Sequence, residues 1–442
     1  MEIIKFKNTV KNHLPPFAQN IYSKCYHKYG LWKESKMIKK APLLHKTALN
    51  RVRIKKGSVN VVFFALMDSV WKYDRLYNLM EDDSRYNPTI LVCPIVNYGK
   101  DNMLRNLYQC YDYYKNKGYN VILSYDEKSD RYLDVRSELN PDIIFYTNPY
   151  RGLIDDRYYI DKFQDILTCY VSYFFGNTNL YSTFYDTLVH NLSWAIFTES
   201  NRHSEYIKLG YRQKHNNTVM TGYPGIEYLL SSSKSTPKYD ESWKICSKKM
   251  KRIIWAPHHS LFDSASYSSF MSYNETFFQL ASKFRDKIQI AFKPHPLLRN
   301  KLYDHWGKEK TDEYYDRWKN LENGTLVDGA YENIFITSDA LIHDSGSFMI
   351  EYIFANKPVL RLENGCPSHY YGDFAKECLA LHEHAYSAQD IEKFIISVIN
   401  GEDSNKEKRT KFIESYKNEI GGDSPSNNIM NYINGQLGLS NK

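Results

Sequence analysis

Apolar runs rich in β-branched and aromatic residues recur along the chain from residue 59 onward, and each is followed by a polar turn and a stretch with helical spacing. The first run, VNVVFFAL, stops at Met67-Asp68-Ser69, and the helical pattern VWKYDRLYNLME follows it. Continuous apolar runs are typical of strands that are buried on both faces of a parallel sheet. Strands are therefore predicted in the first half at 59–66, 88–96, 120–125, 142–148, 168–175 and 193–200.

The pattern restarts after the polar, Ser- and Lys-rich stretch 231–252, which we interpret as an inter-domain linker or a long surface loop. Strands that alternate with helices indicate βαβ units and parallel sheets. The predicted fold is thus α/β, with two Rossmann-like doubly wound domains that face a cleft. In the second half, strands are predicted at 252–259, 287–296, 333–338, 339–347 and 357–362, with helices at about 269–285 and 347–356.

Composition sets the number of domains and the class of protein. The 442 residues are too many for one ordinary core and suit two or three domains. With 42% hydrophobic and 25% charged residues, the chain has the composition of a soluble globular protein. The predicted parts are a basic, mainly helical head (1–57), a first Rossmann-like domain (58–225), a second Rossmann-like domain (226–400) and a C-terminal helical segment (401–442).

The cysteines and the apolar stretches bear on the compartment. The 7 cysteines are scattered without CxxC spacing, which argues against a disulfide framework or a zinc site and favours a reducing cytoplasm. No run of about 18 uncharged apolar residues occurs, so we expect no transmembrane helix. The N-terminal MEIIKFKNTVKNHL disperses its charges and lacks the apolar core of a signal peptide.

The positive charge is concentrated in the head. Residues 1–57 contain 14 Lys or Arg against only Glu2 and Glu34, whereas the whole chain has a net charge of +7. A basic head that also carries aromatic and aliphatic residues suits the anionic inner face of a membrane. The alternative is a solvated basic face docked on the first domain. Nucleic acid is a weaker third option, because no nucleic-acid motif contains these residues. The apolar residues of the head are Phe6, Phe17, Tyr22, Tyr26, Leu31 and Trp32.

Polar side chains gather where three predicted strands of the second half end. In an open α/β sheet, the loops at the carboxyl ends of the strands form the ligand site. Because these three loops would share one sheet edge, they predict a convergent site, although each motif is weak alone. The residues are His258, His259 and Ser260 from WAPHHS, Lys293, His295 and Arg299 from AFKPHPLLR, and His343, Asp344, Ser345, Gly346 and Ser347 from LIHDSGS.

The LIHDSGS loop has the features of an anion site. Ser345-Gly346-Ser347 opens the predicted helix FMIEYIFAN, so unpaired N–H groups and the positive end of the helix dipole point out of the sheet edge. Gly346 would let an anion approach the backbone, and the two hydroxyls could donate to it, as phosphate is bound at a helix start. The alternative is turn chemistry, with Asp344 or Ser345 as an N-cap. Beside the other two loops, the anion site is the preferred interpretation, with Asp344 among the residues that bind the anion.

Glu351 lies four residues after Ser347, on the same helical face and one turn deeper. A carboxylate there could accept hydrogen bonds from both hydroxyls of a ribose whose phosphates lie at Ser345–Ser347. The alternative is a solvated glutamate. It fits less well, because Phe348, Met349 and Ile350 indicate that this helix is largely buried.

His295 stands between two prolines, which stiffen its backbone and fix the direction of its ring. With Lys293 and Arg299 it forms a positive patch suited to a diphosphate leaving group. A protonated His295 or Lys293 could neutralise the charge that develops on such a group. The alternatives are a capped turn and a surface basic pair.

The first half carries thinner signals. An acceptor hydroxyl would need a general base, and Asp68 or Glu199 could serve; His190 and His203 are further candidates that are more often structural. The chain has no GxGxxG, Walker or GxSxG motif, so hydride transfer and serine hydrolysis are poor interpretations. Other polar or aromatic residues near the strand ends are Ser69, Trp71, Asn97, Tyr98, Gly99, Asn148, Tyr150, Ser172, Tyr173, Asn177 and Thr198.

The polar loops of the second half resemble those of the CDP-glycerol glycerophosphotransferase family. This family includes polymerases and primases of wall teichoic acid and related capsule enzymes. The resemblance covers about residues 215–365 well and the first half only in layout. It rests on TGYPGIEYL, RIIWAPHHS, AFKPHPLLR and SDALIHDSGSFMIEYIFANKPVL. The last motif is also similar to nucleotide-sugar 2-epimerases and GT-B glycosyltransferases, whose Ser-Gly-x and following Glu bind diphosphate and ribose.

The resemblance implies a GT-B fold, with a nucleotide-diphosphate donor, CDP-glycerol favoured, in the second domain and the acceptor in the first. It implies that His295 contacts the donor phosphates and assists the leaving group, that Ser345–Ser347 hold the diphosphate, and that Glu351 holds the ribose. His258 and His259 stand where the family often has Thr, so His258 is a catalytic candidate and His259 a donor contact. No cofactor and no metal are expected, because positive side chains and a helix start replace them. The family is peripheral on the inner membrane face, which favours the membrane interpretation of the head.

One departure concerns the first domain. Teichoic-acid polymerases carry a Trp-His-Gly-x-x-Leu-Lys motif there, whose His is thought to be the base. The corresponding region of this chain reads CYVSYFFGN, with neither His nor Lys. This leaves the base and the acceptor open, with Asp68 as the candidate catalytic residue of the first domain.

The leading hypothesis is a transferase that moves a glycerol-phosphate-like or glycosyl group from a CDP- or UDP-activated donor onto a cell-surface polysaccharide, teichoic-acid-like or lipid-linked acceptor. One alternative is a conventional GT-B nucleotide-sugar glycosyltransferase of capsule synthesis. Another is a catalytically silent nucleotide-binding scaffold, which the missing histidine motivates. The expected location is the cytoplasm, peripheral on the inner face of the plasma membrane. The head (1–57) would contact anionic lipid, and nucleic acid is not an expected partner.

Overall fold

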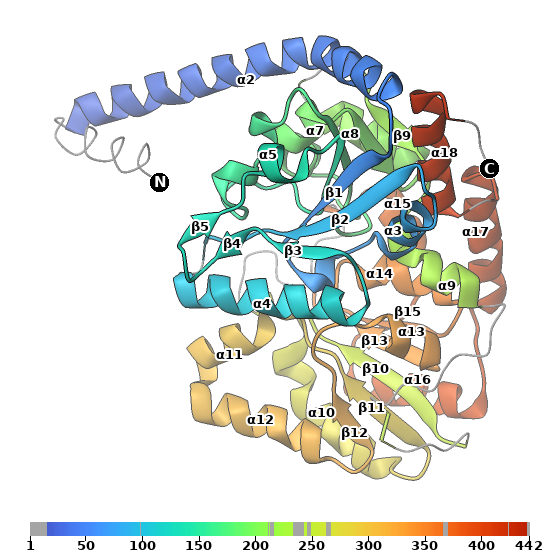
Figure 1. Cartoon of the computed structure of the whole chain (residues 1–442). Coiled ribbons are helices and arrows are strands. Elements are labelled where there is room, and N and C mark those ends of the chain that lie inside the picture. Colours follow the sequence, from blue (N-terminus) through green and yellow to red (C-terminus); the bar gives the residue numbers. More distant parts are fainter. Residues whose placement is uncertain are drawn as a thin grey trace.

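Two parallel sheets dominate the structure, one above the other in Figure 1, and helices flank both. The α/β fold with two Rossmann-like sheets and a basic helical head is thus confirmed. The computed structural model describes residues 16–97, 99–210, 212, 216–232, 243–244, 249–261, 267–365, 370–422 and 424–439.

The first sheet has β1 near its centre, because every side chain of VVFFA is buried. β1 pairs in parallel with β2 on one side and β6 on the other, so the carboxyl ends of the strands share one edge. In the described residues the strand order is β3-β2-β1-β6-β7-β8-β9: β1 (Val59–Ala65), β2 (Tyr86–Val92), β3 (Val121–Leu123), β6 (Ile143–Tyr146), β7 (Leu167–Val171), β8 (Ala195–Thr198) and β9 (Thr218–Met220). The main helices of this half are α3 (Asp74–Glu81), α4 (Lys100–Asn116), α5 (Val135–Leu139), α6 (Tyr181–Phe184), α7 (Leu188–Leu192), α8 (Asn201–Gly210) and α9 (Glu227–Ser232), with the 3-10 turn η1 (Asp68–Val70).

The second sheet is also parallel, and β10 lies between β11 and β13. Its order in the part of the chain that the structure describes is β12-β11-β10-β13-β14-β15: β10 (Lys251–Ala256), β11 (Ile288–Phe292), β12 (Gly324–Leu326), β13 (Ala340–His343), β14 (Val359–Leu362) and β15 (Glu383–Ala385). The helices are α10 (Phe270–Lys283), α11 (Leu298–Trp306), α12 (Lys308–Asn320), α13 (Glu332–Thr337), α14 (Phe348–Glu351) with the 3-10 turn η5 (Tyr352–Ala355), α15 (Asp373–Leu379), α16 (Ala388–Asn400), α17 (Lys406–Glu419) and α18 (Pro425–Leu437).

Three details differ from the sequence predictions. The run NIFITS is not a strand but the helix α13, which buries Ile334, Phe335 and Thr337; short apolar runs do not distinguish the two by periodicity. β9, β12 and β15 went unpredicted, because three residues are too few for a pattern. Most of the predicted linker 231–252 lies outside the described residues, but Trp243 within it is buried and donates a hydrogen bond to Thr337 Oγ1 (2.8 Å).

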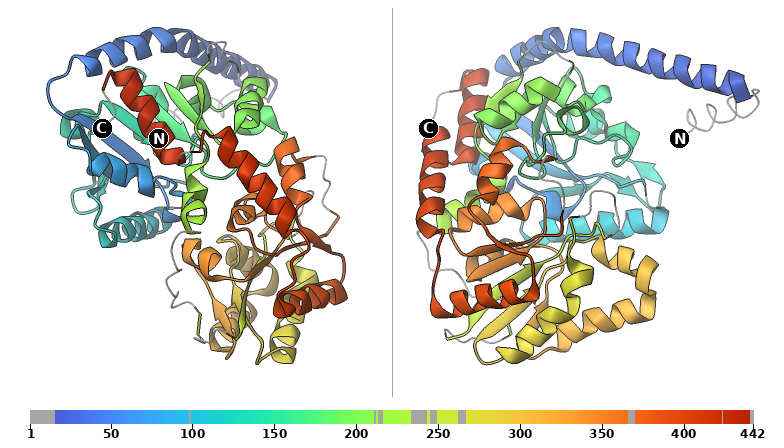
Figure 2. Two further views of the ribbon diagram at one scale, coloured as in Figure 1. Left: turned by 90° about the vertical axis from the view of Figure 1, so that its right-hand side faces the viewer. Right: turned by 180° about the vertical axis from the view of Figure 1, so that it is seen from behind.

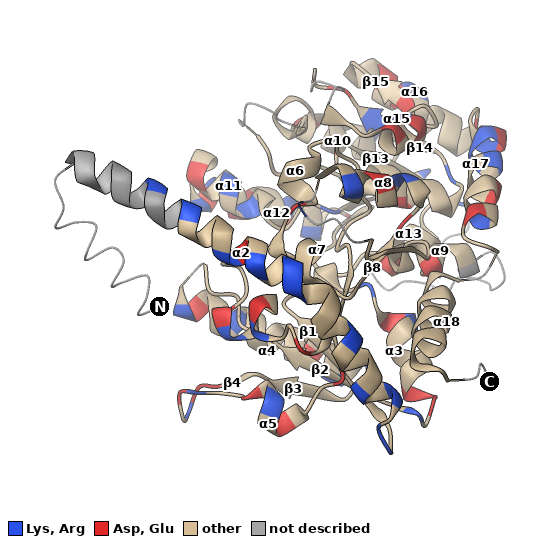
Figure 3. Cartoon of the chain, turned by 90° about the horizontal axis from the view of Figure 1, so that it is seen from above, with Lys and Arg blue, Asp and Glu red and all other residues tan. Residues whose placement is uncertain are grey.

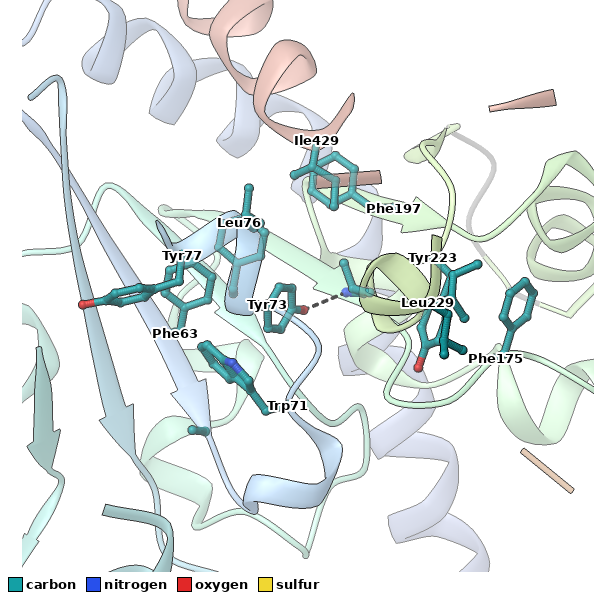
Figure 4. Close-up of a cluster of buried hydrophobic side chains, with 14 of the residues drawn as sticks. Phe63, Trp71, Tyr73, Leu76, Tyr77, Phe175, Phe197, Tyr223, Leu229 and Ile429 are labelled. Atoms are coloured by element: carbon teal, nitrogen blue, oxygen red, sulfur yellow. Dashed lines mark hydrogen bonds between the residues drawn. The ribbon is translucent and has the colours of Figure 1, made fainter. Parts of the chain in front are cut away.

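Aromatic side chains fill the core of the first sheet (Figure 4). Phe63 packs on Trp71, Tyr73 and Tyr77, with ring centroids 5.4–5.9 Å apart. The Tyr73 hydroxyl accepts a hydrogen bond from the Val171 N–H (3.0 Å) and donates one to the Tyr146 carbonyl (2.8 Å). This satisfied hydroxyl fixes β6 and β7 against the helix that follows β1.

The C-terminal helices connect the two halves (Figure 2). α17 packs against η5 of the second half, while α18 packs against α3 and α2 of the first. Asn434 on α18 accepts a hydrogen bond from the Tyr86 hydroxyl (2.7 Å), and the Tyr416 hydroxyl on α17 donates to the Glu199 carbonyl (2.9 Å). The end of the chain therefore holds the two sheets in one arrangement.

The helix α2 (Pro16–Arg53) lies across the first sheet and extends beyond the body of the protein. Its second part packs through residues at helical spacing, of which Ile38, Ala41 and Val52 are buried. Its first part exposes Leu31 and Trp32, amid the Lys residues that Figure 3 shows along the helix. No helix among the described residues is long and apolar enough to cross a membrane.

Candidate functional site

The three polar loops of the second half lie at one edge of the sheet, as the sequence predicts. The loops follow β10, β11 and β13, which are adjacent and parallel. The first two loops are also tied together, because the His295 N–H donates to the Pro257 carbonyl (3.1 Å) and the Lys293 N–H to the Trp255 carbonyl (2.8 Å). The strand order thus brings together residues that are up to about 90 positions apart in the chain.

His258, His259 and His295 form a compact cluster at this edge. The centroid of the His259 ring lies 4.3 Å from that of His258 and 4.2 Å from that of His295, and the other pair is 5.2 Å apart. All three residues are half-buried. Their nitrogen atoms lie within 4.8 Å of one another, close enough to hold a metal ion.

The hydrogen bonds of two rings point to an anion instead of a metal. His295 Nδ1 accepts from the Leu297 N–H (3.1 Å), and His258 Nδ1 accepts from the Ser260 N–H (3.3 Å) and contacts Ser260 Oγ (2.8 Å). A neutral imidazole whose Nδ1 is an acceptor carries its proton on Nε2. In both rings Nε2 is therefore an N–H donor, whereas a metal would need the lone pair of that nitrogen.

Burial favours the neutral form of two rings of the cluster, His258 and His295. Burial, together with the neighbouring His259, lowers the pKa of His258 to about 3 and that of His295 to about 2. Burial also lowers the pKa of Lys293, while Asp328, Glu332 and Asp68 act in the opposite direction. The sequence suggests a protonated His295 or Lys293 beside a leaving group; without a ligand, burial favours the neutral form of His295. An arriving anion would favour protonation of the same rings.

Asp344 supports the loops from a buried position. Its carboxylate is fully buried and accepts hydrogen bonds from the His258 N–H, from the Ser269 N–H (2.6 Å) and from Ser269 Oγ (2.7 Å). Burial raises the pKa of Asp344 to about 6, although these donors act in the opposite direction. The predicted direct contact with an anion is wrong for this side chain, because its oxygens are occupied in joining the β13 loop to the β10 loop and to α10.

The Ser345–Ser347 turn lies between Asp344 and the helical segment formed by α14 and η5. The N-cap of α14 is Ser347, not Asp344 or Ser345 as the alternative interpretation has it, and the Ser347 side chain makes no cap hydrogen bond. Beneath the turn, the buried Arg361 donates to the Ser345 carbonyl (3.5 Å) and to the Tyr371 hydroxyl (2.7 Å). Arg361 is a functional candidate that the sequence predictions missed; an Arg inside the apolar run KPVLRL was the available signal.

Glu351 is 1% exposed, and its carboxylate accepts a hydrogen bond from the Tyr331 hydroxyl (2.7 Å). Lys72, which follows β1 of the first sheet, donates to the oxygen of the same hydroxyl (2.8 Å). Burial raises the pKa of Glu351. In this arrangement Glu351 anchors a contact between the two halves. A ribose would have to replace Tyr331 to reach it, so the ribose role stays a prediction.

Arg299 lies on α11, where its guanidinium forms an ion pair with Asp312 (2.7 Å) and lies over the Tyr315 ring (4.7 Å). The predicted patch of Lys293, His295 and Arg299 is therefore divided. The first two residues lie in the loop, whereas Asp312 holds the third against α12. A role of Arg299 in binding phosphate stays a prediction.

Several candidate residues at the edge of the first sheet bind the protein's own backbone. Asp68, on η1, is half-buried and accepts from the Ser69 N–H (2.7 Å), and its charge acts on Lys293 of the second half. Glu199 accepts from the Gly176 N–H (3.2 Å), and His203 Nε2 bonds the Gly176 carbonyl (2.8 Å), so both support a loop. His190 is buried, and burial lowers its pKa to about 3.

The region CYVSYFFGN ends in that loop. Phe175 is fully buried and stacks on Phe374 (5.2 Å) and Phe354 (5.9 Å) of the second half. Figure 4 shows its ring beside Tyr223, 5.0 Å away. The segment that carries a His in teichoic-acid polymerases thus contributes an interdomain contact here. Tyr98, another candidate of the first half, lies outside the described residues.

Comparisons with known proteins bear on this site. A family model described as CDP-glycerol:poly(glycerophosphate) glycerophosphotransferase matches residues 178–434, more than half of the chain. That range contains all three loops of the second sheet. No curated protein sequence matches the chain.

Solved structures share the fold. The wall teichoic acid polymerase TagF superposes with a TM-score of 0.52 at 14% identity, covering 95% of this chain and 97% of that one. TagF soaked with CDPG gives a TM-score of 0.52 at 13% identity, with 93% and 98% covered. A UDP-N-acetylglucosamine 2-epimerase gives 0.54 at 14% identity, with 88% and 98% covered. These likenesses show that the two sheets have the GT-B arrangement.

Proposed function

The chain belongs to the CDP-glycerol:poly(glycerophosphate) glycerophosphotransferase family, and from this premise we propose that it transfers a glycerol-phosphate-like group from a CDP-activated donor to a cell-surface polysaccharide or teichoic-acid-like acceptor. Its membership makes it a transferase; the donor and the acceptor are the proposed part. The observation that supports the proposal is the convergence of the β10, β11 and β13 loops at one edge of the sheet.

In the proposed donor complex, the diphosphate lies between the Ser345–Ser347 turn and the histidine cluster. The Nε2–H groups of His258 and His295 donate to the phosphate oxygens, and Lys293 supplies positive charge beside them. Hydrogen bonds to charged oxygens are stronger than those between neutral groups. Donors that are already in place cost no reorganisation when charge develops on the leaving group.

The transfer itself follows from the chemistry of a nucleoside-diphosphate ester. The acceptor hydroxyl oxygen forms a bond to the phosphorus that carries glycerol, the P–O–P bridge breaks, and CMP leaves with the bridging oxygen. The hydroxyl proton goes to the Asp68 carboxylate at the edge of the first sheet. The charge of this carboxylate acts on Lys293 of the second half. His295 donates a hydrogen bond to the departing phosphate.

Donor specificity tests the proposal directly. Purified full-length protein is incubated with CDP-glycerol, UDP-glucose or UDP-N-acetylglucosamine and a teichoic-acid-type acceptor, and release of CMP, UMP or UDP is measured. We expect CMP release that depends on the acceptor. Turnover only with the UDP-sugars would replace the proposal by a glycosyltransferase. Nucleotide binding without turnover would favour a silent subunit, which the position of Phe175 motivates.

We further propose that the protein works in the cytoplasm against the inner membrane face, with α2 as its contact. Leu31 and Trp32 are 42% and 52% exposed, and Lys36 Nζ lies 3.7 Å from the Trp32 ring centroid. An exposed apolar pair among lysines suits an anionic lipid surface. Deletion of the whole head would be a poor test, because Ile38–Val52 pack on the first sheet.

Substitution is the sharper experiment for the membrane contact. The double change Leu31→Glu and Trp32→Glu should abolish sedimentation with vesicles of phosphatidylglycerol and phosphatidylcholine. Tyr386→Glu, at a 73% exposed aromatic residue far along the chain, serves as the control. Binding of the wild type should weaken with salt. Equal vesicle binding by the double variant and the control would remove α2 from this role.

A further inference from the structure

Asn177, on the loop that follows β7 of the first sheet, covers the Ser345–Ser347 turn of the second. A Cβ atom added at Gly346 would lie 2.9 Å from Asn177 Nδ2. Gly346 is not among the glycines with positive φ, so its backbone does not require glycine. A side chain at position 346 would instead meet the amide of Asn177, which would have to shift away from the turn.

The backbone around Asn177 is held on both sides. The Gly372 N–H donates to the Asn177 carbonyl (3.0 Å), and the Asn179 N–H and Thr178 Oγ1 both donate to the Tyr370 carbonyl (3.0 and 3.1 Å). These bonds join the two halves by a short antiparallel bridge. Behind them, the Gly176 N–H is bound by Glu199. The backbone that carries the Asn177 side chain is therefore held in place by the fold.

The amide itself is left without a protein acceptor. No hydrogen bond of the Asn177 side chain occurs within the residues that the structure describes, although the residue is half-buried. The amide nitrogen is not fully buried, so its N–H groups remain available to a ligand that approaches the turn. The amide nitrogen lies beside Gly346, in the turn where the proposed diphosphate lies.

We propose that Asn177 Nδ2 donates a hydrogen bond to the diphosphate of the nucleotide donor, so that the first half completes the donor site. This inference rests on the proposed function, which places the diphosphate at the turn. Asn177 lies next to Phe175 in the segment that departs from the polymerase motif. The loop thus contributes a phosphate contact from the half that would otherwise bind only the acceptor.

Calorimetric titration of the full-length protein with CDP and with cytidine tests the contact. Asn177→Asp replaces the donor by a negative charge and should raise the Kd for CDP about 10- to 100-fold, while cytidine affinity stays the same. Asn177→Ala should raise the CDP Kd about 3- to 10-fold. Neither change removes an interdomain backbone hydrogen bond, so Tm should stay close to that of the wild type. Asn179→Asp, the same change two residues away, is the control and should bind CDP like the wild type.

The outcomes separate this inference from the proposed function. Equal CDP affinity in Asn177→Asp and the wild type would overturn the contact alone. Equal weakening in Asn179→Asp would overturn it too, because the effect would then be one of general charge. A wild type that binds CDP no better than cytidine would overturn the diphosphate site, and the Asn177 contact with it.

Discussion

The two sheet edges that face each other are built differently. At the edge of the second sheet, three adjacent strands end in polar loops, with Asp344 beneath them as a buried support and Arg361 as a buried positive charge. At the edge of the first sheet, the corresponding positions mix aromatic side chains, such as Tyr173 and Phe175, with polar ones, such as Asn148 and Ser172. The polar groups there, such as Glu199, bind the protein's own loops.

This difference indicates which half of the protein provides the groups that act on the phosphate donor. Donor groups that are already positioned and partly desolvated stabilise developing charge, so the second edge suits a phosphate donor. The first edge contributes packing through Phe175 and a few polar groups that face across, among them Asp68, Lys72 and Asn177. The donor should therefore bind to a nearly complete site, whereas catalysis on the acceptor side depends on few residues.

The largest effect should come from His295→Ala at the second edge. Loss of the Nε2–H donor should lower the rate of CMP release about 100- to 10,000-fold, because one positioned proton donor typically contributes that much. His305→Ala, at an exposed histidine on α11, is the matched control and should keep its activity. An unimpaired His295→Ala would show that the second edge does not carry the leaving group.

Asp68→Asn sharpens the comparison from the other side. We expect kcat to fall about 100- to 1,000-fold, because the amide cannot accept the hydroxyl proton. The Kd for CDP should change much less than kcat, because Asp68 acts on the donor site only through its charge on Lys293. The control Asp101→Asn, exposed on α4, should leave both values unchanged. If CDP affinity falls as much as kcat, Asp68 belongs to the donor site.

Asp344→Asn compares the supports of the two edges by stability. The amide has only one acceptor oxygen for three donors, so the free energy of unfolding in urea should drop by about 1–3 kcal/mol. Glu199→Gln should cost less, since that carboxylate accepts the single Gly176 N–H. Equal losses would mean that both edges are supported alike.

The smallest effect is a pH dependence of stability. The pKa values of His295 and His190 are lowered to about 2 and about 3, so the unfolded chain takes up protons near pH 6.5 while the folded chain does not. Stability should fall from pH 6.5 to pH 5, by up to about 1.4 kcal/mol per pH unit for each such histidine.

Bound nucleotide should affect His295 and His190 differently, because they lie in different halves of the protein. Saturating CDP raises the pKa of imidazoles beside the diphosphate, so it should flatten the contribution of His295 and leave that of His190. His295→Gln should reduce the slope only without CDP, and His190→Gln in both conditions. Urea unfolding at pH 7, 6 and 5 measures the slopes. A slope that CDP does not change would place the histidine cluster outside the diphosphate site.

Most of the fold could be predicted from the pattern of residues. Long apolar runs such as VNVVFFAL predicted strands well, because burial on both faces leaves a continuous signal. The run NIFITS was predicted as a strand and is a helix, because six residues do not reveal a period. The polar loops after β10, β11 and β13 were found for the same reason as the strands: each interrupts an apolar run.

The roles within the site depended on contacts that no local pattern contains. From its motif, Asp344 was predicted to bind an anion or to cap a helix. In the structure its carboxylate accepts hydrogen bonds from Ser269 and from the His258 N–H, which are 75 and 86 positions away in the chain. Arg299 reads as part of a basic patch, but Asp312 on the next helix holds it. Partners of this kind come from packing, which sequence distance does not show.

The sequence by itself determined the class of fold, the three loops and the residues in them, because hydrophobic periodicity and strand-end position are local properties. Only the tertiary structure decided that burial lowers the pKa of His295 and that Asp344 holds the His258 N–H. It also decided that Tyr331 binds Glu351 and that Asn177 lies close to Gly346. Burial and hydrogen bonding act between elements that are far apart in the chain. Their effect exists only once both sheets and the C-terminal helices are in place.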